Sequence, residues 1–311
     1  MSIKKNIQRK SKSSANILNE LNTIRDFIRL AVSQFIQAQI YFGHGTDNAW
    51  DEAVYLVLHT LHLPQNIDQA MLDAKLTTSE KQAVLKIIGR RIKERVPAAY
   101  LTQEAWFAGL SFYVDERVLI PRSPMAELIQ KQFAPWIDPE KVKRILDIGT
   151  GSGCIAISCA YAFPNATIDA VDISKAALKV AAINCAKHNR TKQIRLLQSD
   201  LFGALKNTTY DIIISNPPYV SRAEMQLLPQ EYRHEPSGAL LAGKNGDEIV
   251  EVILKEAPKH LSPDGILVVE VGNSEPVVLQ KYPHLPFTWL EFEKGEAEVF
   301  LLTADQLRIS S

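Results

Sequence analysis

The sequence predicts an α/β protein in which a doubly wound, mostly parallel β-sheet follows a helical domain and a linking β-hairpin. Up to about residue 95, apolar residues recur at three- and four-residue spacing, which is typical of helices that bury one face. After about residue 140, short β-branched runs alternate with helical segments. Such alternation requires crossover helices between parallel strands, and it therefore predicts a doubly wound sheet.

The helical domain is predicted to comprise residues 1–99. Within it, the apolar side chains of residues 24–38 fall on one face of a helix. Thr77 and Glu80 have the spacing of a capping box, which opens another helix that Pro97 ends. The first twelve residues carry five Lys or Arg side chains and predict a disordered basic tail, with an RNA contact as the alternative.

A linker and a sheet domain follow. Residues 100–124 alternate aromatic and small apolar side chains, which predicts a strand pair linking the two domains and ended by Pro121 and Pro124. Residues 125–311 are predicted to form the sheet domain. Its seven strands are expected at residues 143–148, 167–172, 193–198, 210–215, 265–271, 287–293 and 297–303. Its helices are expected at residues 153–163, 175–188, 246–260 and 274–281.

The composition indicates which classes of partner and which cellular compartment to expect. Thirty-five Lys plus Arg balance thirty-five Asp plus Glu, so no overall positive field favours nucleic acid. The three cysteines lack Cys-x-x-Cys spacing and are expected to be buried thiols in a reducing compartment. No apolar run approaches the roughly 20 residues that span a bilayer. We therefore expect a cytoplasmic protein with neither a membrane partner nor a specific nucleic-acid partner.

A glycine-rich loop marks the predicted ligand site. Residues 145–153 read ILDIGTGSG and run from a buried strand through a sharp turn into a helix. Sheets of this kind bind nucleotide-like ligands at such a turn, because glycine lets the backbone approach the ligand closely. The loop alone leaves two ligands open, since Gly151, Gly153 and Ala156 also fit the dinucleotide fingerprint of a nicotinamide-dependent dehydrogenase.

Three acids follow successive strands of the predicted sheet. Asp147 stands in front of the glycines, where a carboxylate would crowd a pyrophosphate but suits the cationic amino-acid moiety of S-adenosylmethionine. Asp172 is placed to accept hydrogen bonds from both ribose hydroxyls, or to cap the helix that begins near Ser174. Asp200 is placed to accept a hydrogen bond from the adenine amino group, or to form a simple turn. Together the acids favour S-adenosylmethionine over a dinucleotide.

The strand at 210–215 ends in Asn216-Pro217-Pro218-Tyr219. Each proline fixes its own φ and bars the preceding residue from a helix. The Asn216 side chain and the Pro217 carbonyl are therefore held in position, and little conformational entropy is lost when they bind an acceptor. Two acceptors then face one NH2 group, and the Tyr219 ring flanks it. This arrangement suits an amide or aromatic amine, whose lone pair is delocalised, although a Pro-Pro turn is also a simple strand terminator.

Methyl transfer to such a nitrogen needs mainly orientation, because the cofactor supplies an activated methyl group. No metal and no covalent nucleophile are required. No obvious His or Glu base lies near the tetrapeptide in the sequence, and the nitrogen proton can leave after the methyl group arrives. His234 and Glu235 follow in the loop, and we expect that histidine to be incidental.

At these residues the sequence resembles the protein glutamine amide methyltransferases, from about residue 95 onward. The resemblance is carried by DIGTGSGCIAI, VDIS, SDLF and SNPPYV, and it implies a seven-stranded, Rossmann-like methyltransferase sheet. It implies that Asn216 touches both the cofactor and the acceptor and that Pro217, Pro218 and Tyr219 complete a glutamine pocket. The cofactor site that the loop and the resemblance predict comprises Asp147, Gly149, Thr150, Gly151, Gly153, Asp172, Asp200 and Asn216.

Two further segments resemble one branch of that family. Residues 41–53 and the run Pro121-Arg122-Ser123-Pro124 look like the branch that acts on protein three of the large ribosomal subunit, rather than on peptide-chain release factors. Ala49 departs from the proline expected in that branch. From the residues alone, 42–52 form a structured loop opening a helix, with Asp47 or Asn48 as its cap and Trp50 as its anchor.

The sequence therefore predicts an enzyme that methylates a glutamine amide of large-subunit protein three, using S-adenosylmethionine and releasing S-adenosylhomocysteine. The helical domain is expected to recognise the protein substrate, and ribosome assembly intermediates are a further partner to test. A release-factor methylase, an adenine amino methyltransferase acting on nucleic acid and a non-catalytic ribosome-assembly factor stay open as alternatives.

Overall fold

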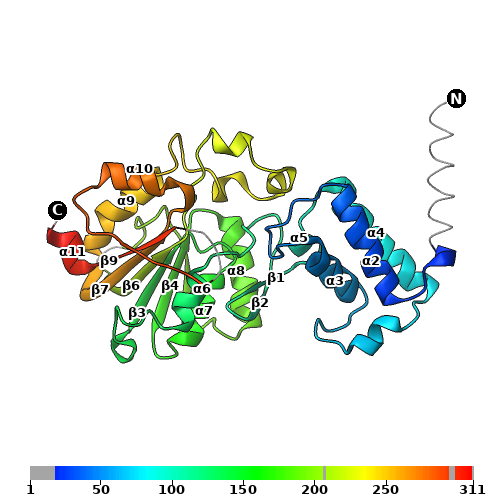
Figure 1. The fold of residues 1–311 in the computed structure, drawn as a ribbon. Helices are drawn as coiled ribbons and strands as arrows, with labels where there is room; N and C mark the ends of the chain where they lie inside the picture. The colour runs from blue at the N-terminus through cyan, green and yellow to red at the C-terminus, as the bar shows by residue number, and fades with distance from the viewer. Residues whose placement is uncertain (1–17, 206–207, 294–297, 310–311) are drawn as a thin grey trace. The chain divides into compact units, whose positions relative to one another are not determined.

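The structure, a computed structural model, describes residues 18–205, 208–293 and 298–309 (Figure 1). The chain divides into two compact units, Met1–Thr102 and Gln103–Ser311. The basic tail that the sequence predicts lies outside the described residues. Within the described ranges, no helix is both long and apolar enough to cross a membrane.

The first unit is helical, and local capping signals set its helix starts. Thr77 and Glu80 form the predicted capping box, in which the Thr77 side chain accepts from the Glu80 N–H and the Glu80 carboxylate accepts from the Thr77 N–H. Buried apolar side chains of four helices form one core. The elements are α2 (Ile24–Gln37), α3 (Ala49–Thr60), the 3₁₀ turn η1 (Gln69–Asp73), α4 (Thr78–Glu94) and α5 (Ala98–Thr102).

The loop before α3 is held from beneath by a buried ion pair. Arg91 donates to Glu52 at 2.6 Å and to the Tyr41 carbonyl at 2.7 Å, and both charged side chains are buried. Asn48 is the N-cap of α3, as one of the two expected caps, because its side chain accepts from the Asp51 N–H. Trp50 is 50% exposed, so the prediction that it anchors the loop was wrong.

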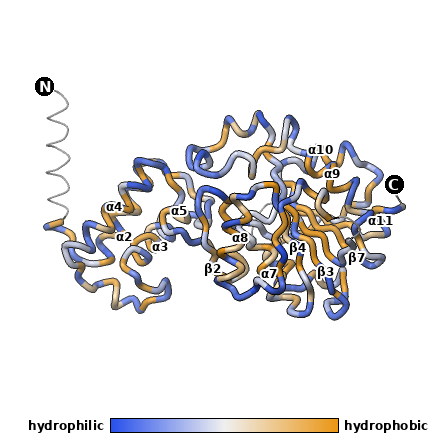
Figure 2. Tube along the Cα trace, turned by 180° about the vertical axis from the view of Figure 1, so that it is seen from behind, coloured by the Kyte–Doolittle hydropathy of each residue, from blue (hydrophilic) through white to orange (hydrophobic). Residues whose placement is uncertain are grey.

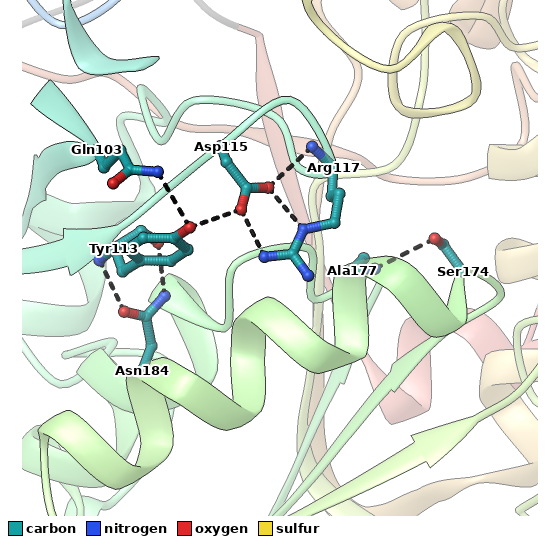
Figure 3. A network of polar contacts seen from close by, with 7 residues as sticks. All are labelled: Gln103, Tyr113, Asp115, Arg117, Ser174, Ala177 and Asn184. Carbon is teal, nitrogen blue, oxygen red and sulfur yellow. Dashed lines mark hydrogen bonds and ion pairs between the residues drawn. The ribbon is translucent and has the colours of Figure 1, made fainter. Parts of the chain in front are cut away.

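A β-hairpin opens the second unit. Strands β1 (Glu104–Phe107) and β2 (Leu110–Tyr113) pair antiparallel, and they are shorter than the predicted linker strands. Figure 3 shows how β2 is fixed: the Asn184 side chain accepts from the Tyr113 N–H at 2.7 Å and donates to the Tyr113 carbonyl at 2.9 Å. The same amide donates to the Ser152 carbonyl at 2.8 Å, so one buried side chain joins the hairpin to the glycine loop.

The central sheet has the strand order β5-β4-β3-β6-β7-β9-β8. Strands β3 to β7 are parallel, whereas β9 runs antiparallel between β7 and β8. The fold class predicted from the sequence is confirmed. The strands are β3 (Arg144–Ile148), β4 (Thr167–Asp172), β5 (Ile194–Gln198), β6 (Tyr210–Ser215), β7 (Leu261–Glu270), β8 (Thr288–Trp289) and β9 (Val299–Thr303).

Helices cover both faces of this sheet. Alternate strand residues enter two separate cores, one closed by α6 and α7 and the other by α9, α10 and α11. Figure 2 shows the apolar strands β3, β4 and β7 gathered at the centre of the unit. The helices are α6 (Met125–Gln130), α7 (Cys154–Ala162), α8 (Lys175–Lys187), α9 (Glu248–Glu256), α10 (Glu275–Lys281) and α11 (Ala304–Ile309). Short 3₁₀ turns are η2 (Pro139–Lys141), η3 (Glu224–Gln226), η4 (Gln230–His234), η5 (Ser237–Ala239), η6 (Ala257–Lys259) and η7 (Gly272–Ser274).

Several predicted boundaries were wrong, and one of them is the start of β7, which lies at Leu261 instead of 265. The helix expected at 246–260 ends at Glu256, because Pro258 has no N–H for the helical ladder and the chain tightens into η6. The strand expected at 287–293 is reduced to Thr288–Trp289, and the Leu290 N–H adds one further bond to β9, to the Val299 carbonyl at 2.9 Å.

Candidate active site

The predicted site residues lie at the carboxyl ends of parallel strands. Asp200, Asp172, Asp147 and Asn216 follow or end β5, β4, β3 and β6, which are successive neighbours in the sheet. The order of strands along the chain reverses between β3 and β6, and open α/β sheets bind ligands at such a switch point. The Ser215 hydroxyl donates to the Ile148 carbonyl at 2.9 Å and ties these two strand ends together.

Three successive backbone N–H groups of the glycine loop already bind to the protein itself. Gly149 and Thr150 both donate to the Val171 carbonyl, and Gly151 donates to the Asp172 carboxylate at 2.9 Å. A pyrophosphate site needs such N–H groups to converge on the anion. The loop therefore fits a ligand without phosphate, and the dehydrogenase alternative loses its physical basis.

Asp147 lies fully buried beneath the loop. Its Oδ2 accepts from the Thr150 hydroxyl at 2.6 Å and from the Ala156 N–H in the first turn of α7 at 3.1 Å. Its Oδ1 is buried without a hydrogen-bond partner among the described residues. Burial raises the pKa of Asp147 to about 7, the Asp172 charge adds to the rise, and the two hydrogen bonds oppose it. An acid in this state gains from a cation, which fits the ammonium of S-adenosylmethionine.

Asp172 braces the same loop from β4. Its Oδ2 accepts from Gly151 and its Oδ1 accepts from the Ser174 N–H at 2.8 Å. The cap of α8 is Ser174, whose side chain accepts from Ala177 (Figure 3), so Asp172 is not that cap. Each carboxylate oxygen can accept a second hydrogen bond, which leaves capacity for ribose hydroxyls. Burial raises the pKa of Asp172.

Ile173, directly after Asp172, was missed by the sequence reasoning. It is 66% exposed at the carboxyl end of β4, an unusual place for a large aliphatic side chain. A flat apolar ligand such as adenine would cover it. An apolar residue directly after the acid that ends β4 was the signal that could have found it.

Asp200 is exposed beside a surface hollow of about 660 Å³. Its carbonyl accepts from the Gly203 N–H, which makes the simple turn that was one of the two alternatives. The adenine role predicted for its side chain stays a prediction. Leu201 and Phe202 line the same hollow, and Phe202 stacks on His260 with ring centroids 4.9 Å apart.

The tetrapeptide that follows β6 sits against the glycine loop. A Cβ on Gly149 would lie 3.8 Å from the Asn216 carbonyl oxygen, so the two turns are neighbours. Pro217 is buried, while Asn216 and Tyr219 are half-buried. The Tyr219 ring packs over Gly272, where an added Cβ would meet ring carbon Cε2 at 2.6 Å.

A carboxylate that lies far away along the chain, Glu270 at the end of β7, also reaches this turn. The Tyr219 hydroxyl donates to Glu270 Oε1 at 3.0 Å, and the Ser123 hydroxyl donates to Oε2 at 2.5 Å. Glu270 directly follows the buried apolar run at residues 266–269 in β7, the strand next to β6, which is the same signal that identified Asp147 and Asp172. Burial raises its pKa.

The run 121–124 is fixed by a second missed residue. The Arg122 guanidinium donates to both oxygens of Glu235, at 2.6 and 2.8 Å, and the carboxylate also accepts from the Ile120 N–H. The Glu235 side chain is fully buried, so this two-pronged pair replaces its hydration. The pair keeps Ser123 beside Glu270. Among the described residues, no cluster of three or more His, Cys, Asp or Glu side chains could hold a metal ion.

Comparison with known proteins agrees with this fold. The Methyltransferase small domain family matches residues 130–231. The catalytic domain of hMettl16, solved with the MAT2A 3′UTR hairpin 6, superimposes with a TM-score of 0.51 at 17% identity, over 72% of this chain and 81% of that one. That likeness supports the fold alone. The fold and the site together define a methyltransferase.

Two relatives are much closer in sequence. The ribosomal protein uL3 glutamine methyltransferase of Bordetella pertussis is 51% identical over 293 residues, which cover 94% of this chain and 98% of the relative. The protein of the same name from Neisseria meningitidis serogroup B is 53% identical, over 93% of this chain and 95% of the relative. This chain belongs to the ribosomal protein uL3 glutamine methyltransferase family.

Proposed function

We propose that this protein transfers a methyl group from S-adenosylmethionine to the side-chain amide nitrogen of a glutamine in ribosomal protein uL3. The single observation that carries the chemistry is the position of Asn216 beside the glycine loop, at the sheet's switch point. The names of the relatives supply the substrate. We place the reaction in the cytoplasm and assign no metal to it.

In this proposal Asp147, Asp172 and the loop of Gly149 to Gly153 hold the cofactor. The open Oδ1 of Asp147 faces its ammonium, Asp172 accepts from its ribose hydroxyls, and Asp200 accepts from its adenine. When bound, S-adenosylmethionine supplies a methyl group activated by a positively charged sulfur and leaves as S-adenosylhomocysteine.

The tetrapeptide orients the acceptor. Asn216 Oδ1 and the Pro217 carbonyl each accept one N–H of the glutamine amide, and Tyr219 flanks its plane. Because the prolines fix the backbone, these acceptors are set before the substrate arrives, and orientation of this kind contributes a large part of a transfer barrier. The proton leaves the nitrogen after the methyl group has been received.

Replacing Asn216 tests this assignment. Asn216→Ala is expected to lose more than about a hundredfold in methylation of purified uL3, because one of two acceptors is removed, while thermal stability stays close to the parent protein. The matched control is Asn165→Ala, an exposed asparagine in the turn before β4 at the opposite sheet edge. Full activity of Asn216→Ala would refute the proposal that Asn216 and the Pro217 carbonyl hold the acceptor amide.

We further propose that the helical unit recognises the protein substrate. The buried Arg91–Glu52 pair holds the segment that runs from the loop before α3 into that helix. Tyr41 in the loop and Trp50 in the first turn of α3 are exposed, and exposed aromatic side chains on a held segment suit protein recognition. Exchanging residues 1–99 for those of a release-factor methylase should redirect methylation from uL3 to the release factor. Unchanged substrate choice would show that the sheet unit alone selects the substrate.

A side-by-side assay separates the alternative acceptors. Purified uL3, a release factor and a single-stranded RNA are offered with labelled S-adenosylmethionine, and we expect label in uL3 alone. In cells lacking this chain, mass spectrometry should find uL3 lighter by about 14 mass units, the mass that one methyl group adds when it replaces hydrogen. Label in RNA would favour the adenine alternative. The two acceptors, Asn216 Oδ1 and the Pro217 carbonyl, could hold the NH2 group of an amide or of an adenine.

A further inference from the structure

A run of positive charge lies between the acids Asp172 and Asp200. Residues 173–199 contain six Lys or Arg side chains and no Asp or Glu, although the whole chain carries 35 charges of each sign. The run forms α8, the turn that follows it and β5, the edge strand of the sheet. A chain with no net charge therefore contains one strongly positive segment.

Most of these cations are exposed and have no neighbouring carboxylate. Three lysines lie on the exposed face of α8, and a fourth is exposed in the turn after it. They are Lys175, Lys179, Lys187 and Lys192. Within the described part of the chain none of the four forms an ion pair, whereas Arg195 is paired with Asp169 at 2.7 Å. The positive field of the four lysines is therefore open to an anion from outside the chain.

An exposed tryptophan lies beside the end of α8. Lys187 donates to the Ser111 hydroxyl at 2.6 Å, and His188 Nε2 donates to the Ser111 carbonyl at 3.1 Å. Ser111 pairs with Trp106 across the hairpin, and residues directly opposite in an antiparallel pair share one face. Trp106, which is 55% exposed, therefore lies on the hairpin face that meets Lys187. The single acid on that face of the two strands, Glu104, is half-buried.

A second exposed ring contacts the same histidine from α7. Tyr161 is 44% exposed and packs edge-on against His188, with ring centroids 5.8 Å apart. The Arg190 guanidinium lies over the Tyr161 ring, 4.1 Å from its centroid. Figure 2 shows α7, α8 and β2 side by side. We call the exposed set that these elements share the α8 surface: Trp106, Tyr161, Lys179, Lys187, Arg190 and Lys192.

The exposed rings distinguish between the polyanions that a positive surface attracts. An acidic peptide would use the cations alone. A single-stranded nucleic acid uses both features, because its phosphates pair with cations and its bases stack on aromatic side chains. Bases within a duplex are stacked on one another and are not available to the rings.

We propose that the α8 surface binds a segment of single-stranded RNA, with phosphates at its lysines and bases stacked on Trp106 and Tyr161. The surface is separate from the predicted acceptor site, so the RNA is bound and is not methylated. The choice of RNA over DNA rests on the proposed function, whose substrate is a ribosomal protein.

The salt dependence of binding tests the lysines. Fluorescence anisotropy follows a labelled oligouridine of about 12 nucleotides. A triple variant should reduce the slope of log affinity against log salt by about 2, because each phosphate contact on a single strand contributes about 0.7. Its changes are Lys179→Gln, Lys187→Gln and Lys192→Gln. An unchanged slope would overturn the proposal.

The matched control removes the same charge elsewhere in the second unit. It replaces three exposed lysines, two of them at the end of α9, which covers the other face of the sheet from α7. They are Lys141→Gln, Lys255→Gln and Lys259→Gln. We expect a slope close to that of the parent protein, and a fall as large as in the first triple variant would overturn the assignment to the α8 surface.

Replacing one tryptophan tests the stacking. Trp106→Ala should weaken binding of the oligouridine by about 5- to 100-fold with the salt slope unchanged. The control is Trp50→Ala, because Trp50 is 50% exposed on α3 in the other unit, and it should bind like the parent protein. Equal affinity of the two variants would overturn the stacking. Polyglutamate that displaces the oligouridine at equal charge concentration would instead identify an acidic protein as the partner and overturn the choice of RNA.

The binding assay contains neither S-adenosylmethionine nor uL3, so it separates this proposal from the proposed function. Binding of the oligouridine by a protein that does not methylate uL3 would sink the proposed function and leave the α8 surface standing. Methylation of uL3 by a protein that does not bind the oligouridine, even at low salt, would overturn the α8 surface alone.

Discussion

Replacing Gly272 by alanine should separate active-site geometry from stability. Gly272 has a φ of +46°, and a Cβ there would lie 2.6 Å from Cε2 and 2.9 Å from Cδ2 of the Tyr219 ring. Gly109, at the turn of the β1–β2 hairpin, has a φ of +78°, and its added Cβ would meet nothing within 4 Å. The two substitutions share the backbone strain, and only one carries the clash.

The expected magnitudes follow from these distances. Alanine in the left-handed region costs roughly 1–2 kcal/mol, which lowers the melting temperature of a domain of this size by about 2–8 °C in either variant. Carbon atoms pack at about 3.5–4.0 Å, so the Tyr219 ring must retreat by about 1 Å in Gly272→Ala. A displacement of that size near the reacting atoms can cost about a hundredfold in rate.

The assay compares melting temperature, cofactor affinity and methylation of uL3 for both variants. We expect similar melting temperatures and near-normal binding of S-adenosylmethionine, with about a hundredfold loss of kcat in Gly272→Ala alone. Equal activity of the two variants, whether retained or lost, would refute the argument that the position of Tyr219 limits the reaction.

Three further predictions concern buried groups around the site. Because the folded pKa of Asp147 is about 7 and its ordinary value is 3.8, the ligand-free protein should lose stability as pH rises from about 4 to 7. Over the same range calorimetry should show rising affinity for the cationic cofactor, and Asp147→Asn should abolish that rise. Asn184→Ala leaves the β2 backbone and the Ser152 carbonyl unpaired, and thermal unfolding should show a loss of about 3 kcal/mol or more. Arg122→Ala leaves the Glu235 carboxylate buried without the Arg122 cation and should lower the free energy of unfolding by about 3–5 kcal/mol. Arg122→Lys should lower it less, because lysine keeps the charge but loses the two-pronged contact. Unfolding curves of the Asn184 and Arg122 variants that match the parent protein would contradict these estimates.

The sequence predicted the sheet well where strands are buried on both faces. Strands β4 and β6 have the predicted bounds, because their apolar runs stand between polar turns. Strand β8 was overestimated, since residues 287–293 have a strand-like pattern but their contact with β9 is limited to two described residue pairs and one further backbone bond at Leu290. A local pattern does not reveal whether a partner strand lies alongside.

Only those site residues that lie next to a recognisable turn could be predicted from the sequence. Asp147, Asp172 and Asn216 follow strands in recognisable motifs, and the sheet order brings them to one edge. Glu270 and Glu235 contact partners that lie 147 and 113 positions away along the chain, and no local pattern predicts such pairs. The exposure of Trp50 depends likewise on tertiary packing, in which Arg91 and Glu52 occupy the interior instead.

The inner position of β9 has a consequence for synthesis of the protein. Strand β9 lies between β7 and β8 and follows every other strand of the sheet along the chain. The other strands therefore leave the ribosome before β9 is available to complete the sheet. Until residues 299–303 emerge, the edge of β7 has no partner, and an unpaired apolar edge invites pairing with other chains. A protein shortened before β9 should therefore aggregate rather than fold with a trimmed edge, and this enzyme completes its sheet only late in translation.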